Sequence, residues 1–237
     1  MTPRIKHDKP DLRSALSSSV GKKVLTGVTG FAWAGFVILH MAGNLSYFGA
    51  GEAYNEYAHK LLSTGPLLYT VEIVLLVCLV IHAILGVNIY LGKRRARKQG
   101  YSTYRSAGRP GLQSPSSRTM ILTGVVLLVF LVIHLKSFKF GPGIAEGYSL
   151  LVDGEPIRDL KRLVTEKFQH PLYAFGYTGV MVLLGFHLRH GVWSALQSLG
   201  AMNRRLTPLI YGIAALLAVG IAAGFIVLPL YIYFFAP

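Results

Sequence analysis

Five long runs of apolar residues, separated by polar or charged loops, dominate the chain. A membrane-spanning helix needs about 20 mostly apolar residues, and inside the bilayer such runs satisfy their backbone hydrogen bonds as helices. Gly65-Pro66 and His170-Pro171 mark two helix starts, since proline suits the first turn. We predict an all-α integral membrane protein with an N-terminal arm at 1–23 and a single domain at 24–237, with spans at about 24–48, 66–92, 118–138, 170–199 and 206–234.

The composition points to the same class of protein. Hydrophobic residues make up 52% of the 237 residues and charged residues only 14%, whereas a soluble domain carries about 25% charged residues. This shortage of charge excludes an ordinary soluble enzyme, a disordered regulator and a coiled coil. The single cysteine, Cys78, excludes a disulfide framework, a thiolate zinc site and a cysteine-ligated iron–sulfur cluster on this chain alone.

The net charge of +14 lies in clusters between the apolar runs, which indicates membrane orientation and not nucleic-acid binding. Sixteen Lys and Arg residues lie before the first run, between the second and third, and between the fourth and fifth, against seven on the other side. Cytoplasmic loops carry such an excess. We therefore predict a cytoplasmic-membrane protein with its N-terminus in the cytoplasm and its C-terminus outside. The face from Lys93 to Arg118, with the N-terminal arm, is expected to dock a soluble partner.

Four histidines, one in each of the first four predicted spans, fall at two depths. His40 and His134 lie 17 and 16 residues after the last basic residue before their outward-running spans. Both therefore sit about 25 Å from the cytoplasmic edge at ~1.5 Å per residue. His82 and His187 each lie 16 residues after the proline that begins their inward-running span, which places them about 24 Å from the outer edge. The result is an outer and an inner layer, each with two facing histidines.

Each layer suits one haem, because neutral imidazole is a strong axial ligand for iron. We predict two bis-histidine b-type haems, with His40 and His134 on the outer and His82 and His187 on the inner. The first four spans are expected to form a bundle that encloses the haems, and the fifth span to lie at its periphery. The chain lacks the Cys-x-x-Cys-His segment of c-type attachment. Six-coordinate iron has no open position for oxygen, so these haems carry electrons. A single intramembrane histidine is more often a helix–helix hydrogen bond or a proton relay, but four of them, paired in depth, favour haem.

Weaker signals surround these histidines. Arg189 and His190 are expected to meet the propionates of the inner haem, whose carboxylates need cationic partners. His190 is also an alternative to His187 as the ligand. Several glycines would let a flat macrocycle approach the backbone, although small residues also serve ordinary helix packing: Gly27, Gly30, Gly35, Gly86, Gly176, Gly179 and Gly185.

Short segments around the four histidines occur in a set order along the chain. They are Phe36-Val-Ile-Leu-His40, Leu68-Tyr-Thr-Val-Glu72 leading to Ile81-His82-Ala83, Ile133-His134-Leu135, and Phe186-His187-Leu-Arg-His-Gly-Val-Trp-Ser194. In this order the chain, from about Gly21 to its end, resembles the di-haem cytochrome b membrane anchor of succinate dehydrogenase and fumarate reductase. The last segment is the most specific.

The resemblance implies that the four histidines ligate two haems, first with third and second with fourth, which is the pairing that depth also indicates. It implies a complex with a flavoprotein that interconverts succinate and fumarate and with an iron–sulfur subunit, and it is compatible with a higher oligomer of that complex. The anchor would pass electrons between the iron–sulfur subunit and a membrane quinone, with menaquinone favoured by resemblance. The chain has no Gly-x-Gly-x-x-Gly motif and no cysteine cluster to hold flavin or an iron–sulfur centre.

The quinone site is a weaker prediction. Glu72 lies about 9 Å below the outer edge, where a carboxylate can take quinol protons, although a hydrogen bond to a neighbouring helix or to haem explains it slightly better. Glu56 and His59, expected in an outer loop, are further candidates.

Two other functions stay open. The chain is also compatible with the cytochrome b subunit of a membrane hydrogenase or formate dehydrogenase, which uses histidine haem ligands too. A haem-free transporter with a histidine proton relay is the third, and it predicts colourless protein and inverted repeats or broken helices.

Overall fold

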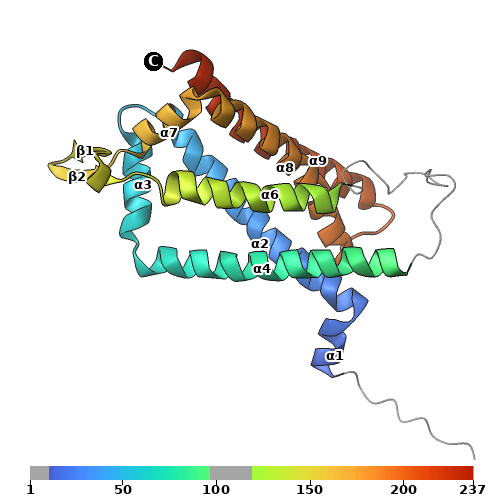
Figure 1. Ribbon diagram of the computed structural model, residues 1–237. Helices are drawn as coiled ribbons and strands as arrows, with labels where there is room; N and C mark the ends of the chain where they lie inside the picture. The colour runs from blue at the N-terminus through green and yellow to red at the C-terminus, as the bar shows by residue number, and fades with distance from the viewer. Residues whose placement is uncertain (1–10, 97–118, 237) are drawn as a thin grey trace, which may run out of the picture.

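The computed structural model of the chain describes residues 11–96 and 119–236 (Figure 1). A 3₁₀ turn (Ser46–Phe48) follows the first long helix, a π turn (Leu135–Lys139) continues the third, and a second 3₁₀ turn (Ile144–Glu146) precedes the strands. The helices and strands, in chain order, are α1 (Leu12–Ser17), α2 (Ser19–Leu45), α3 (Ala53–Ser63), α4 (Pro66–Arg95), α6 (Met120–His134), β1 (Ser149–Val152), β2 (Glu155–Arg158), α7 (Leu160–Gln169), α8 (Pro171–Ser198) and α9 (Thr207–Phe235).

Five of these helices are long and apolar enough to cross a membrane, which confirms the prediction of a mostly helical, multi-pass membrane protein. They are α2 with its 3₁₀ turn, α4, α6 with its π turn, α8 and α9. The first begins at Ser19, ahead of the apolar run, because the Ser18 side chain accepts a hydrogen bond from the Gly21 amide and caps the helix.

Two helix starts follow the predicted proline signal. Pro66 and Pro171 occupy the first turn of α4 and α8. Gly65, with φ of 52°, turns the chain into α4 in a backbone conformation that a side chain disfavours. His170 caps α8, since its Nδ1 accepts the Leu172 amide at 3.3 Å.

The long helices pack unequally. Helix α8 packs along α9 and against α2 and α6, whereas α4 packs mainly against α2. Helix α9, expected at the periphery, also contacts α2 and α7. Large side chains along α4, such as Leu67, Ile73 and Leu76, are about 60% exposed, as they are where lipid tails surround a helix.

One end of the long helices carries a polar cap, which consists of α3, the β1–β2 hairpin and α7, and the C-terminus lies near it (Figure 1). The hydrophobic pattern did not predict these short elements. The antiparallel strands are joined at Asp153 and Gly154, both with positive φ, as a tight hairpin requires. The opposite end carries α1 and the end of α4 (Figure 1).

A buried asparagine fastens the cap together. Asn55 on α3 is 1% exposed. Its amide nitrogen donates to Glu52 Oε2 at 2.8 Å and to Asp159 Oδ1 at 3.1 Å, and its carbonyl oxygen accepts the Lys161 amide at 2.8 Å. Because every polar atom of this side chain is satisfied, α3 is fixed against the start of α7.

Candidate metal centre: two histidine pairs between the spans

The structure brings the four intramembrane histidines together as two pairs. His40 on α2 and His134 on α6 have ring centroids 5.7 Å apart, with the ring planes at 87°. His82 on α4 and His187 on α8 have centroids 6.3 Å apart, with the planes at 56°. We call these the outer pair and the inner pair, after the predicted layers; the outer pair is the one nearer the polar cap.

These separations are compatible with one iron between each pair. Two imidazoles bound on opposite sides of a metal ion, with metal–nitrogen bonds of about 2 Å and ring centres about 1 Å beyond, place their centroids roughly 6 Å apart. The observed 5.7 and 6.3 Å bracket this value. Within the described residues, no three His, Cys, Asp or Glu side chains gather where they could hold a metal ion. A bis-histidine haem needs only two, so the donor set fits haem and does not fit a metal held by side chains alone.

The inner pair is held by hydrogen bonds to its second ring nitrogens. His82 Nδ1 lies 3.0 Å from the carbonyl oxygen of Thr26, and His187 Nδ1 lies 3.1 Å from the hydroxyl of Thr123. Iron-ligating histidines usually make such a bond through the nitrogen that does not bind the metal. It leaves each Nε2, with its lone pair, for a ligand.

The outer pair has a different environment. The Asn44 amide nitrogen donates to the carbonyl oxygen of His40 at 2.8 Å and lies 3.4 Å from His40 Nε2. Asn44 in turn accepts a bond from the Tyr54 hydroxyl in the polar cap at 3.2 Å. His134 Nδ1 is buried and lacks a hydrogen-bond partner among the described residues. The outer pair is therefore linked to the cap on one side and has an unsatisfied polar atom on the other.

Aromatic rings surround the outer pair. Phe36 stacks on His40 with centroids 5.4 Å apart, and Phe130 stacks on His134 at 5.7 Å. Phe138 and Tyr177 also contact the His134 ring. An apolar shell of this kind keeps water from a metal site and influences its reduction potential.

The glycines divide between the two roles that the sequence left open. Gly27 and Gly185 serve helix packing, because a side chain there would press on Ala195 and Ala222. Gly30 makes room for the His82 ring, whose Cε1 would lie 3.1 Å from an added Cβ. The remaining predicted glycines adjoin open space, as a flat ligand would require: Gly35, Gly86, Gly176 and Gly179.

At the opposite end from the cap, Arg189 and His190 lie three residues or fewer beyond His187. The His190 ring contacts Trp193 edge-on at 4.8 Å, and Lys93 and Arg189 lie close enough to His190 to interact with it electrostatically. His190 Nδ1 and the Tyr211 hydroxyl are buried, and neither has a hydrogen-bond partner among the described residues. This cluster has the positive charge that a carboxylate needs. The ring that lies beside His82 is that of His187, with centroids 6.3 Å apart.

Glu72 lies near the cap end of α4 and forms an ion pair with Lys139, the last residue of the π turn. Both side chains are about one-third exposed. The bond to a neighbouring helix, which the sequence already favoured slightly, is therefore present. Glu56 and His59 both lie on α3 and not in the loop that the sequence predicted.

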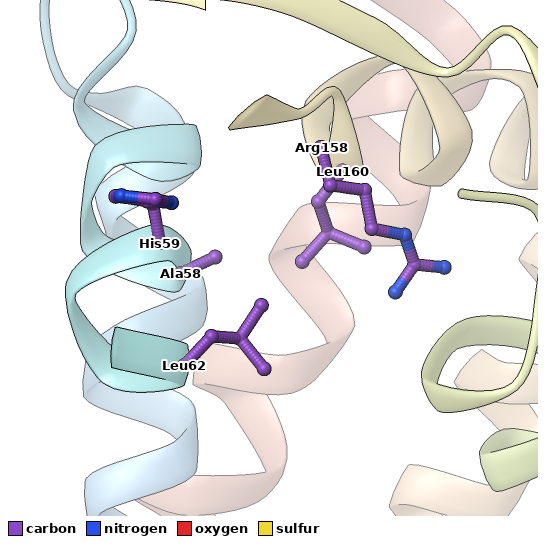
Figure 2. Close-up of a pocket in the computed structure, with 5 residues that line it drawn as sticks. All are labelled: Ala58, His59, Leu62, Arg158 and Leu160. Carbon is purple, nitrogen blue, oxygen red and sulfur yellow. The ribbon is translucent and has the colours of Figure 1, made fainter. Parts of the chain in front are cut away.

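His59 lines a small pocket between α3 and the end of β2 (Figure 2). The pocket has a volume of about 30 Å³, which is room for about one water molecule. Its other lining residues are Ala58, Leu62, Arg158 and Leu160. As formed, it is too small for a quinone ring.

Arg158, which borders this pocket, ties the hairpin to the third span. Its guanidinium donates to the carbonyl oxygens of Phe138, Gly141 and Pro142 at 2.8–3.1 Å. Burial lowers the pKa of Arg158 below its ordinary value, but arginine stays charged at any physiological pH. Arg158 thus satisfies the carbonyls at the end of the helix that carries His134.

Several of these residues were missed in the sequence. Each of these residues contacts a predicted site residue or the end of a helix that carries one: Thr123, Asn44, Lys139 and Arg158. None of them belongs to a motif that the sequence alone would single out. One signal was available: Thr29-Gly30 and Thr123-Gly124 precede their outer histidines at the same spacing. The predicted docking face at Lys93 to Arg118 lies mostly outside the described residues, as does the start of the N-terminal arm.

No family model, no curated protein and no solved structure matches the chain.

Proposed function

We propose that the chain is the membrane anchor and cytochrome b subunit of a succinate:quinone oxidoreductase, with two bis-histidine b haems. The observation that carries the proposal is the pairing of four histidines, one from each of four helices, at centroid separations of 5.7 and 6.3 Å. Helices α2, α4, α6 and α8 would enclose the haems as a four-helix bundle, with α9 outside it.

Each histidine pair would hold one haem. His40 and His134 would hold the outer haem, and His82 and His187 the inner haem. Haem, when bound, supplies one-electron chemistry between ferric and ferrous iron. The polypeptide would hold the rings, exclude water through the aromatic shell, and offer Arg189 and His190 as cations to the inner propionates.

Glu72 is the best-placed acid for quinone chemistry among the three candidates. It lies near the cap end of α4, on the same side as the outer pair, and it is partly exposed. A quinol that gives up electrons must also release protons, and a carboxylate at the membrane edge can accept them. Menaquinone is the favoured quinone.

The partners and the orientation are part of the same proposal. The basic face on the end opposite the cap would lie in the cytoplasm and dock an iron–sulfur subunit, which in turn would bind the flavoprotein. The polar cap and the C-terminus would lie outside, and the whole complex would sit in the cytoplasmic membrane as part of a respiratory chain.

The deciding experiment is a reduced-minus-oxidised spectrum of the purified protein in detergent, with haem counted per chain. We expect a b-type Soret and α-band and two haems. Colourless protein would support the transporter and overturn the proposal. Co-purified subunits separate the remaining alternative, because a flavoprotein supports the succinate enzyme and a metal hydrogenase or formate dehydrogenase supports the other.

A further inference from the structure

The two outward-running helices share a spacing that connects the two histidine pairs. On α2, Thr29 and Gly30 lie 11 and 10 residues before His40; on α6, Thr123 and Gly124 lie 11 and 10 residues before His134. At ~1.5 Å per residue, this sets each Thr-Gly pair about 16 Å along the helix from its outer histidine. Each Thr-Gly pair is therefore level with the inner pair.

Each Thr-Gly pair meets one inner histidine from the neighbouring helix. On α6, the Thr123 hydroxyl lies 3.1 Å from His187 Nδ1, and a Cβ at Gly124 would lie 3.5 Å from His187 Cε1. On α2, a Cβ at Gly30 would lie 3.1 Å from His82 Cε1. The glycines leave space for the two imidazole rings, and the residues beside them supply polar contacts.

The polar contacts differ between the two sides. The Thr29 hydroxyl is 3.5 Å from His82 Nδ1, at the limit of a hydrogen bond, while the Thr26 carbonyl is closer, at 3.0 Å. A carbonyl oxygen only accepts, so Nδ1 of His82 carries the proton. His82 therefore depends mainly on backbone, which no side-chain substitution removes.

His187 depends on a side chain. Thr123 is 2% exposed, and the carbonyl oxygens of Thr119 and Met120 both lie 3.1 Å from its hydroxyl. The single hydroxyl proton goes to one of these carbonyls, which leaves a lone pair to accept the Nδ1 proton of His187. The acceptor fixes the tautomer in which Nε2 is unprotonated, as well as the direction of the ring.

We propose that Thr123 is a positioning residue for His187: by accepting from Nδ1, it presents Nε2 to the inner iron and strengthens the ring as an electron donor. This inference rests on the proposed function. A better donor stabilises ferric iron, so removing the hydroxyl raises the reduction potential of the inner haem and leaves the outer haem unchanged.

The test compares threonine substitutions in the full-length protein purified with its bound haem. Thr123→Val removes the hydroxyl and keeps the shape, and Thr123→Ser restores it. Thr29→Val makes the same change at the same depth beside His82, which keeps its backbone partner. Thr178→Val is the control, because the Thr178 hydroxyl donates to the Ala174 carbonyl of its own helix. The readouts are redox titration of each haem, low-spin EPR g values and haem content.

We expect Thr123→Val to shift the ferric–ferrous equilibrium of one haem by up to about tenfold, which is about 59 mV for one electron. Its EPR signal should change, Thr123→Ser should be close to wild type, and Thr29→Val and Thr178→Val should have much smaller effects.

The outcomes separate this inference from the proposed function. Two haems with an unchanged titration in Thr123→Val overturn the positioning role alone. A shift of equal size in Thr178→Val also overturns it, because the effect is then general to the helices. Wild-type protein that contains no haem overturns the proposed function and this inference with it.

Discussion

Glu72 on α4 and Lys139 at the end of the π turn form an ion pair that joins the second and third spans beside the polar cap. Packing between α4 and α6 is otherwise sparse. Since both side chains are about one-third exposed, the pair contributes only about 0–1 kcal/mol to stability. A large effect of removing Glu72 would therefore report on chemistry and not on folding.

We predict that Glu72→Gln lowers quinone-dependent turnover by about 10²-fold or more, the range of a lost acid–base group, while haem content and thermal stability stay within error. The measurement is succinate:quinone turnover of the assembled complex beside a melting curve. Lys139→Gln is the matched control, because it breaks the same ion pair and keeps the carboxylate. If both variants turn over at the wild-type rate, Glu72 serves only as a contact between helices.

The histidine pairs predict which substitutions remove the same haem. His82→Ala and His187→Ala should each abolish the inner haem while one haem per chain remains, and His40→Ala and His134→Ala should do the converse. Haem quantitation and redox titration of the four variants measure this. His59→Ala, a histidine on α3 outside both pairs, is the control and should retain two haems. Loss of one shared haem in His40→Ala and His82→Ala would contradict the pairing.

Arg158 should be the most important single residue for attaching the hairpin. Its guanidinium makes three bonds to carbonyls at the end of the third span, and hydrogen bonds to charged groups contribute about 1.5–3 kcal/mol each. We expect Arg158→Met to lower the melting temperature of the detergent-solubilised protein clearly. Arg162→Met removes an exposed arginine of the same cap, whose ion pair with Glu166 is open to solvent, and should barely change the melting temperature. Equal melting temperatures for the two variants would show that the three bonds add nothing.

A cluster on the hairpin and α7 gives the cap a dependence on acid. Hydrogen bonds from Tyr148 and then Arg162 lower the pKa of Glu166 below its ordinary 4.5. A carboxyl whose pKa is lower in the folded state stabilises that state above the unfolded value, and the contribution is lost as pH falls through the folded value. Stability from this group is therefore present at neutral pH and declines below about pH 4.5.

Hydrogen exchange of the segment 148–166 between pH 3 and pH 6 measures this effect. After correction for the intrinsic exchange rate, which itself changes with pH, we expect lower protection of the wild-type hairpin as the pH falls below about 4.5. In Glu166→Gln the acid-dependent part should be absent, with the hairpin slightly less protected near pH 6 and the difference from wild type shrinking as the pH falls. The effect is small, because the Glu166 side chain is exposed to solvent. An identical profile in the two proteins would rule out the cluster as its source.

The five spans and the depths of the four histidines follow from local sequence patterns alone. An apolar run of about 20 residues crosses a bilayer as a helix, so the five helices can be predicted from local pattern. The two helix starts at Pro66 and Pro171 can be predicted in the same way. A rise of ~1.5 Å per residue then sorted the four histidines into two levels. These properties depend on position along one helix, which is why no knowledge of neighbouring helices was needed.

The neighbours of the histidines, and the elements beyond the long helices, depend instead on how the helices pack together. Thr123 contacts His187, Asn44 lies between His40 and Tyr54, and Lys139 pairs with Glu72. Apart from Asn44 with His40, each contact joins residues from different elements, so it requires the helices to pack at particular angles and rotations. Those angles depend on many weak contacts at once. The polar cap was missed for a related reason. Its elements are short and polar, so their stability comes from long-range bonds such as those of Asn55 and Arg158, which no local periodicity of the sequence records.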